Sequence, residues 1–165
     1  MRVLVTGAGG FVGGALVARL AATGHAVVAC ARTLPARPEP AARWVATGDL
    51  EHGRDWGAVL DGIEAVVHLA ARVHRPGDRD EAACVRANVD VAPALARAAA
   101  RAGVRAFVFA STVKVHGERS PVRTDGSPRP FTEADPPAPQ DPYARSKWQA
   151  EQALAAIAAD TGLAV

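Results

Sequence analysis

A short apolar run at residues 3–5 stops at a glycine-rich turn, and an amphipathic helical stretch, residues 11–22, follows the turn. This order predicts a strand, a tight turn and a helix. Gly7 allows the tight turn, Gly10 lets backbone N–H groups approach a pyrophosphate, and Gly13 lets the helix lie close to the strand. Because a helix N-terminus attracts negative charge, we predict that the turn binds the phosphates of a dinucleotide.

Strand-like and helix-like segments alternate along the rest of the chain. Further strands are expected at residues 26–31, 43–47, 64–69 and 105–110, further helices at 55–60, 81–101 and 141–160, a proline-rich loop at 120–142 and the start of a sixth strand at 163–165. The strands are apolar almost throughout, which is typical of a parallel sheet covered on both faces. We therefore predict an α/β, doubly wound Rossmann fold with strand order 3-2-1-4-5.

Composition limits the class of protein. With 165 residues, of which 49% are hydrophobic, the chain can bury one core, so we expect a single domain over residues 1–165. The net charge of +2 gives no support for a nucleic-acid partner, and no apolar run is long enough for a leader or a membrane span. Cys30 and Cys84 have no metal-ligand spacing and suit a reducing, cytoplasmic setting. We expect no metal and no disulfide.

Tyr143 and Lys147 are four residues apart at the start of the last expected helix, which puts them on one helix face. Tyr143 is the only tyrosine of the chain and Lys147 is one of two lysines. A cation beside a phenol favours the phenolate, so the pair can act as a base near neutral pH. Ser111 and Thr112 follow the fifth expected strand, where a hydroxyl can orient a substrate alcohol, although such residues also cap turns.

Polar residues at three other strand ends bear on the cofactor. In NAD-binding sheets of this class an acidic residue ends the second strand, but here that place holds Arg32. Arg32 either pairs with the 2′-phosphate of NADP or is a solvated loop residue. Asp49 is either a contact on the adenine side of the cofactor or an ordinary turn residue. His68 is expected to be structural or part of the cofactor loop rather than a base.

Ordered motifs over almost the whole chain resemble those of the extended short-chain dehydrogenases/reductases. They are Thr6-Gly7-x-x-Gly10-Phe11-x-Gly13, Asp49-Leu50, His68-Leu69-Ala70-Ala71, Asn88-Val89, Ser111-Thr112 with Val115-x-Gly117, and Tyr143-x-x-x-Lys147. The chain resembles in particular the UDP-glucose 4-epimerase-like members of the NAD-dependent epimerase/dehydratase family. The resemblance implies NAD or NADP as cofactor and Thr112, Tyr143 and Lys147 as the catalytic triad. The residues predicted for the cofactor site are Gly7, Gly10, Phe11, Val12, Gly13, Arg32, Asp49, Leu50, Leu69, Ala70, Ala71, Asn88 and Lys147.

The resemblance also implies a reaction on a nucleotide sugar. Epimerisation of a UDP-hexose at C4 is the first expectation, and reduction of a nucleotide 4-keto sugar is the second. A 4,6-dehydratase is disfavoured because the resembling dehydratases carry an Asp-Glu pair where this chain has Val113 and Lys114. Family members continue into a smaller C-terminal domain that holds the sugar nucleotide and is absent from these 165 residues. The alternative of another class is a dinucleotide-binding fragment without catalysis, and a homodimer is possible for the longer form.

Overall fold

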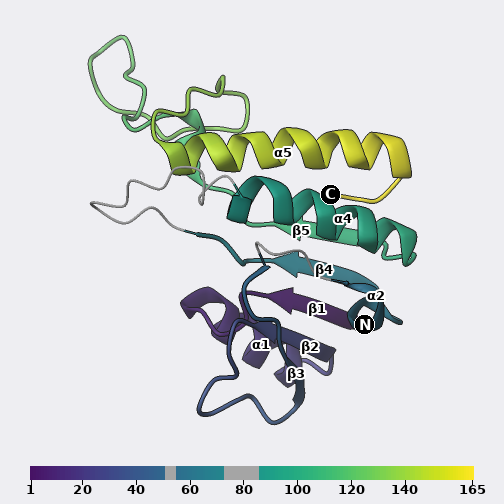
Figure 1. Ribbon diagram of the computed structural model, residues 1–165. Coiled ribbons are helices and arrows are strands. Elements are labelled where there is room, and N and C mark those ends of the chain that lie inside the picture. Colours follow the sequence, from purple (N-terminus) through teal and green to yellow (C-terminus); the bar gives the residue numbers. More distant parts are fainter. Residues whose placement is uncertain (51–54, 73–85) are drawn as a thin grey trace.

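The computed structural model describes residues 1–50, 55–72 and 86–165. Its centre is a five-stranded, all-parallel sheet with the order β3-β2-β1-β4-β5 (Figure 1). The strands are β1 (Arg2–Thr6), β2 (Ala26–Ala31), β3 (Ala42–Ala46), β4 (Ala65–His68) and β5 (Ala106–Phe109). The predicted doubly wound sheet and its strand order are therefore confirmed, with strand limits that differ from the expected ones by at most one residue at either end.

Helices cover both faces of the sheet. The α-helices are α1 (Phe11–Ala22), α2 (Gly57–Leu60), α4 (Val91–Arg101) and α5 (Pro142–Thr161), and two short helical segments are η2 (Arg86–Asp90) and η3 (Val113–His116). Helix α1 packs on one face, while α2, α4 and α5 pack on the other. Figure 1 shows α4 and α5 lying side by side, with the start of α5 at the end of the sheet toward which the strands point.

The central strands bury both of their faces. Val3 and Val5 of β1 pack with Val17 of α1, whereas Leu4 between them belongs to the core under α4 and α5. Alternate residues of β1 thus enter two different cores, which explains why the strand is apolar at every position. Strand β5 is covered less evenly, since Val108, which points to the α1 side, is 55% exposed.

The expected long helix over 81–101 is wrong in its described part. Residues Arg86–Asp90 form a turn of π-helix and only Val91–Arg101 are α-helical, while residues 81–85 lie outside the described chain. Pro93 explains the change, because its nitrogen carries no hydrogen and cannot bond to the carbonyl of Val89 four residues earlier. The wider turn before α4 accommodates that missing bond.

The last helix, α5, begins and ends one residue later than the expected helix over 141–160. Asp141 caps it by accepting a hydrogen bond from Ala144 N at 2.6 Å, and Pro142 occupies the first helical position, where a proline loses nothing. The helix ends at Gly162 in a left-handed conformation. The expected sixth strand is represented by one parallel bridge between Ala164 and Ala106 of β5.

Candidate functional site

Most residues predicted for the site lie just after the carboxyl ends of neighbouring strands. Strand register places Cys30, Thr6, His68 and Phe109 side by side across β2, β1, β4 and β5. The Thr6 hydroxyl lies 2.7 Å from His68 Nδ1 and accepts a hydrogen bond from Ala70 N at 3.3 Å. These contacts tie the end of β1 to the end of β4 and fix the start of the two loops that leave them.

The glycine turn depends on close backbone approaches at two of its glycines. Gly7 has a left-handed φ of 68°, and a Cβ there would lie 2.7 Å from Ala70 N. A Cβ on Gly13 would lie 2.2 Å from the carbonyl oxygen of Gly7. This geometry agrees with the predicted roles of Gly7 in the turn and of Gly13 in close helix packing. The close approach of Gly7 to the loop after β4 was not predicted from the sequence.

The start of α1 is open on the solvent side of this turn. Gly10 is the N-cap, no side chain caps the helix, and no acidic residue lies in its first turn. Phe11 and Val12 beside it are 98% and 61% exposed. Uncapped backbone N–H groups with an open approach and flanking apolar side chains fit the pyrophosphate of a dinucleotide, so the residues present are suited to the predicted cofactor.

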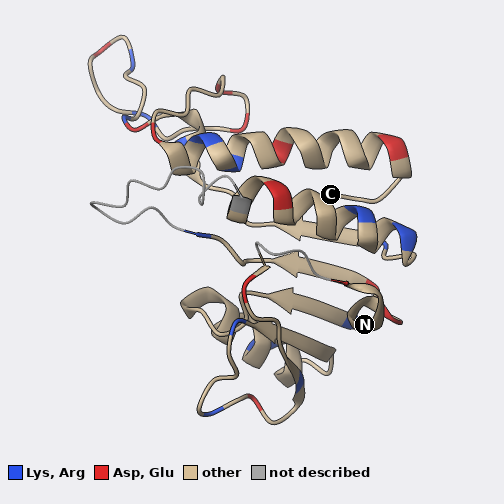
Figure 2. Cartoon of the chain, in the orientation of Figure 1, with Lys and Arg blue, Asp and Glu red and all other residues tan. Residues whose placement is uncertain are grey.

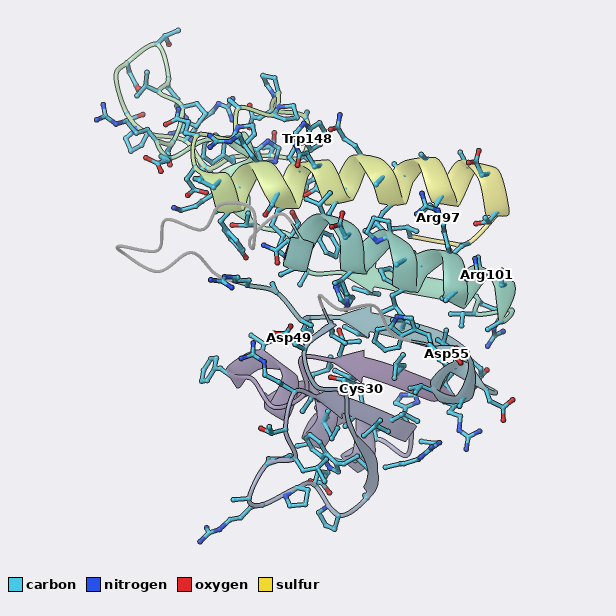
Figure 3. The ribbon with its side chains drawn as sticks, in the orientation of Figure 1. Cys30, Asp49, Asp55, Arg97, Arg101 and Trp148 are labelled. Carbon is cyan, nitrogen blue, oxygen red and sulfur yellow. The ribbon has the colours of Figure 1, made fainter. Side chains whose placement is uncertain are left out.

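The predicted contacts beyond the turn lie on both sides of it. Leu69 and Ala70 are half-buried and Ala71 is exposed on the loop after β4. Arg32 and Asp49 are exposed after β2 and β3, and Figure 3 shows Asp49 toward the end of the sheet where the strands finish. Leu50, in contrast, packs against the core under α4 and α5. Contact of these six residues with a cofactor stays a prediction, as do the other site assignments.

His68 is buried and electrically neutral. Burial and, to a smaller extent, the positive charge of Lys147 together lower the pKa of its imidazole to about 3. Its ring stacks on Phe109 at 6.0 Å between centroids. The imidazole is thus part of the packed base of the site, in agreement with the expectation that His68 is structural rather than a base.

Lys147 brings a buried cation next to Tyr143. The Lys147 side chain is 2% exposed, and its Nζ donates to the carbonyl oxygen of Ala110 at 2.7 Å. The same Nζ lies 4.4 Å from the centroid of the Phe109 ring and 5.9 Å from that of Tyr143. The four-residue spacing therefore does place both side chains on one face of α5, over the end of β5.

Thr112 begins a 3-10 turn that sequence reasoning did not anticipate. Its Oγ1 accepts from Lys114 N at 3.3 Å and caps η3. The preceding residue, Ser111, donates to the carboxylate of Glu151, one turn beyond Lys147 on α5. Lys114 Nζ donates to Asp141 Oδ2, before Lys147 on the same helix. The segment that carries Thr112 is thus held to α5 on both sides of Lys147, so the three predicted catalytic residues share one region of the structure.

Asn88 connects three segments around this region. Its Oδ1 accepts from Arg72 N at 2.8 Å, and its Nδ2 donates to Arg72 O and to Ser146 Oγ, both at 3.0 Å. Asn88 is 1% exposed. Asn88 thus connects η2 to α5 through Ser146 and to the loop after β4 through Arg72. Direct contact of Asn88 with a cofactor remains a prediction.

A metal site, a disulfide and a membrane span each set requirements on the described residues. No cluster of three His, Cys, Asp or Glu side chains there could hold a metal ion. Cys30 is buried on β2, and Cys84 lies outside the described chain. In the described ranges, every helix is too short or too polar to cross a bilayer.

A parallel sheet of this order, with a glycine turn between β1 and α1, defines the class of doubly wound nucleotide-binding folds. The model of the NAD dependent epimerase/dehydratase family matches residues 3–165. The chain belongs to this family. The predicted family membership is confirmed, and with it a nicotinamide dinucleotide as the cofactor of the family.

Known relatives include both epimerases and reductases. A UDP-glucose 4-epimerase of Vibrio cholerae is 34% identical over 99% of this chain and 49% of its own length. A dTDP-4-dehydrorhamnose reductase of Mycobacterium tuberculosis is 32% identical over 94% of this chain and 46% of its own. MoeE5, solved with UDP-glucuronic acid and NAD, aligns at a TM-score of 0.81 with 35% identity over 96% of this chain and 50% of its own. The chain spans about half the length of these relatives.

We expect Gly10→Val to remove measurable dinucleotide binding while the fold is kept. Gly10 is exposed and has ordinary backbone angles (φ −83°, ψ 174°), so the larger side chain extends into solvent, although its Cβ would lie 3.2 Å from Gly7 O and requires a small local adjustment. It fills the space above the start of α1 that a pyrophosphate needs. Quenching of tryptophan fluorescence by NAD measures the affinity, and circular dichroism checks the fold. An unchanged affinity would remove Gly10 from the cofactor site.

Proposed function

We propose that residues 1–165 form the cofactor-binding and catalytic part of a nucleotide-sugar 4-epimerase acting on a UDP-hexose. The nicotinamide, when bound, supplies a reversible hydride acceptor. The turn from Gly7 to Gly13 would hold the pyrophosphate of the cofactor, and Tyr143 would meet the sugar. UDP-sugars in the names of the relatives support this substrate class.

Three side chains carry out the chemistry of the protein in this proposal. Tyr143 removes the proton from the C4 hydroxyl as the hydride leaves, and it returns that proton when the other face of the keto sugar is reduced. Thr112 bonds the same hydroxyl and orients it. Lys147 stabilises the phenolate by its charge and reaches the ribose of the cofactor.

The observation that carries the proposal is the burial of Lys147 at the end of β5. An ammonium group is costly to bury, and Ala110 O is a carbonyl rather than a carboxylate. The Nζ of Lys147 also lies 5.9 Å from the centroid of the Tyr143 ring, so its positive charge acts on the phenol at short range. A cation held in this way favours the phenolate form that a base requires.

Product analysis with the complete product of the gene tests the reaction. Incubation with UDP-glucose or UDP-galactose should interconvert the two without net consumption of reduced cofactor. A reductase, the second candidate supported by the Mycobacterium relative, would instead consume one NAD(P)H for each keto sugar. Conversion of neither substrate, with intact dinucleotide binding, would favour a noncatalytic binding protein.

Arg32 supplies a test of cofactor choice. If its guanidinium reads the 2′-phosphate, NADP binds more tightly than NAD, and Arg32→Ala weakens NADP alone, by about 10-fold for the loss of one charge-assisted contact. Calorimetric titration with both dinucleotides makes the comparison. Arg37, an exposed arginine further along the same connection, provides the matched control. Equal losses for NAD and NADP in Arg32→Ala would show that Arg32 does not select between them.

A further inference from the structure

Lys114, the only lysine besides Lys147, forms an ion pair at the start of α5. Its Nζ donates to Asp141 Oδ2 at 2.7 Å and lies 3.9 Å from Glu118 Oε1. The other oxygen of Asp141 accepts from Ala144 N at 2.6 Å, which caps the helix. One carboxylate therefore joins the η3 turn to the first turn of α5.

This ion pair lies between two of the proposed catalytic residues. Lys114 comes two residues after Thr112, and Asp141 comes two residues before Tyr143. The pKa of Lys114 is raised, first by its hydrogen bond to Asp141 and by the charge of that carboxylate, and more weakly by Glu118 and Tyr143. Asp141, whose other oxygen caps the first turn of α5, thus holds the ammonium group of Lys114 at the helical turn that carries Tyr143.

The pair contributes little to folding. The Lys114 side chain is 48% exposed and that of Asp141 is 21% exposed, and ion pairs of this kind stabilise proteins by about 0–1 kcal/mol. Asparagine caps helices as well as aspartate does, so the cap needs an oxygen at residue 141 but no charge. The charges themselves must therefore be explained by something other than stability.

We propose that Lys114 is a positioning residue for Tyr143: it balances the carboxylate that caps α5, so that this carboxylate does not oppose formation of the Tyr143 phenolate. The inference rests on the proposed role of Tyr143 as the base. Without Lys114, the carboxylate of Asp141, two residues before Tyr143 on α5, would lose the cation that lies 2.7 Å from it. With Lys114 in place, Asp141 still caps the helix, and its negative charge is offset by the ammonium group near the phenol.

Other charges surround Tyr143 as well. Figure 2 shows residues of both signs side by side at the start of α5. Among the side chains that the structure describes, the charged ones on the elements packed around Tyr143 include Lys147, Arg145 and Asp141 on α5, Lys114 and Glu118 at η3, and Asp90 of η2, whereas His68 of β4 is neutral. Lys147 favours the phenolate in all variants, so exchanges at 114 and 141 change only the balance described above.

Direct titration of the phenol tests the proposal without substrate or cofactor. Tyr143 is the only tyrosine of the chain, so the ultraviolet difference spectrum of phenolate formation reports one group, with Tyr143→Phe as the baseline. Lys114→Gln should raise the midpoint by several tenths of a pH unit, and Asp141→Asn should lower it by a similar amount. Lys114→Arg should restore the midpoint of the unchanged protein. Glu118→Gln, which alters a partner of Lys114 outside α5, should have the smaller effect.

Opposite shifts distinguish an electrostatic role from a structural one, because both variants break the same ion pair. Midpoints that move in the same direction, or that do not move, would overturn the proposal. If Lys114→Gln does not fold, Asp141→Asn still tests the proposal. A midpoint of Tyr143 that is unchanged or higher in Asp141→Asn would contradict the expected decrease. The titration needs no sugar, so its failure leaves the proposed reaction intact, and failure of the epimerase assay leaves the titration result standing.

Discussion

Tyr143→Phe should lower the turnover of the complete gene product on its nucleotide sugar by about 10²- to 10⁴-fold, the usual contribution of a general acid–base residue. The exchange removes only the ionisable oxygen, and the ring of Tyr143 keeps its place beside Lys147. Dinucleotide affinity should therefore stay within about twofold of the original value. Initial rates on UDP-glucose and UDP-galactose, together with NAD titration, measure both quantities.

Trp148, the half-buried neighbour of Lys147 on α5, supplies the control for this prediction (Figure 3). Trp148→Phe changes an aromatic side chain of the same helix without removing an acid or a base, so it should retain most of the turnover. Full activity of Tyr143→Phe would assign the proton transfer to another group. Loss of dinucleotide binding in Tyr143→Phe would indicate a structural role instead.

Gly13→Ala should destabilise the fold by about 1–3 kcal/mol or more, whereas Gly14→Ala should stabilise it by up to about 1 kcal/mol. A methyl group on Gly13 would lie 2.2 Å from the carbonyl oxygen of Gly7, and only backbone movement can relieve that contact. A methyl group on Gly14 would meet its nearest atom, Ala8 O, at an ordinary 3.8 Å. The two variants differ by one position on the same helix, so the comparison isolates the close approach.

Urea unfolding of both variants beside the unchanged protein gives the free energies. The order Gly14→Ala, unchanged protein, Gly13→Ala is expected from most to least stable. Equal stabilities of the two variants would mean that α1 can move away from the turn at little cost. In that case Gly13 would not fix the position of the helix.

Much of the fold could be predicted because β1 and its neighbours obey simple local rules. Apolar runs of fixed length, each followed by a polar or glycine-rich stop, define strands buried on two sides, and the order of the sheet follows from the class of fold. The glycine spacing was informative for the same reason, since Gly7 and Gly13 meet backbone atoms that lie close in sequence or in the adjacent loop. Such constraints can be recognised without knowing distant contacts.

The errors and omissions depend on contacts or on single residues that break a pattern. Alanine-rich sequence predicts a helix over 81–101, but Pro93 alone changes the hydrogen bonding before α4. The links of Asn88 to Arg72 and Ser146 join residues far apart in sequence, and no spacing rule predicts them. Asp141 was predictable as a helix cap, yet its pairing with Lys114 was not, because that depends on how η3 packs on α5.

The unequal covering of the sheet also bears on where the molecule can open. Strand β1 is packed from both sides, whereas β5 is exposed at Val108 on the α1 side. Local opening costs less where fewer apolar contacts must be broken, so the cost of fluctuation falls from the middle of the sheet toward β5. The glycine turn follows a strand that is packed from both sides, while Thr112 follows a strand that is packed mainly from the side of α4 and α5. Under the proposed function, the side of the site that meets the sugar can therefore adjust its shape, while the turn that would hold the cofactor keeps a constant one.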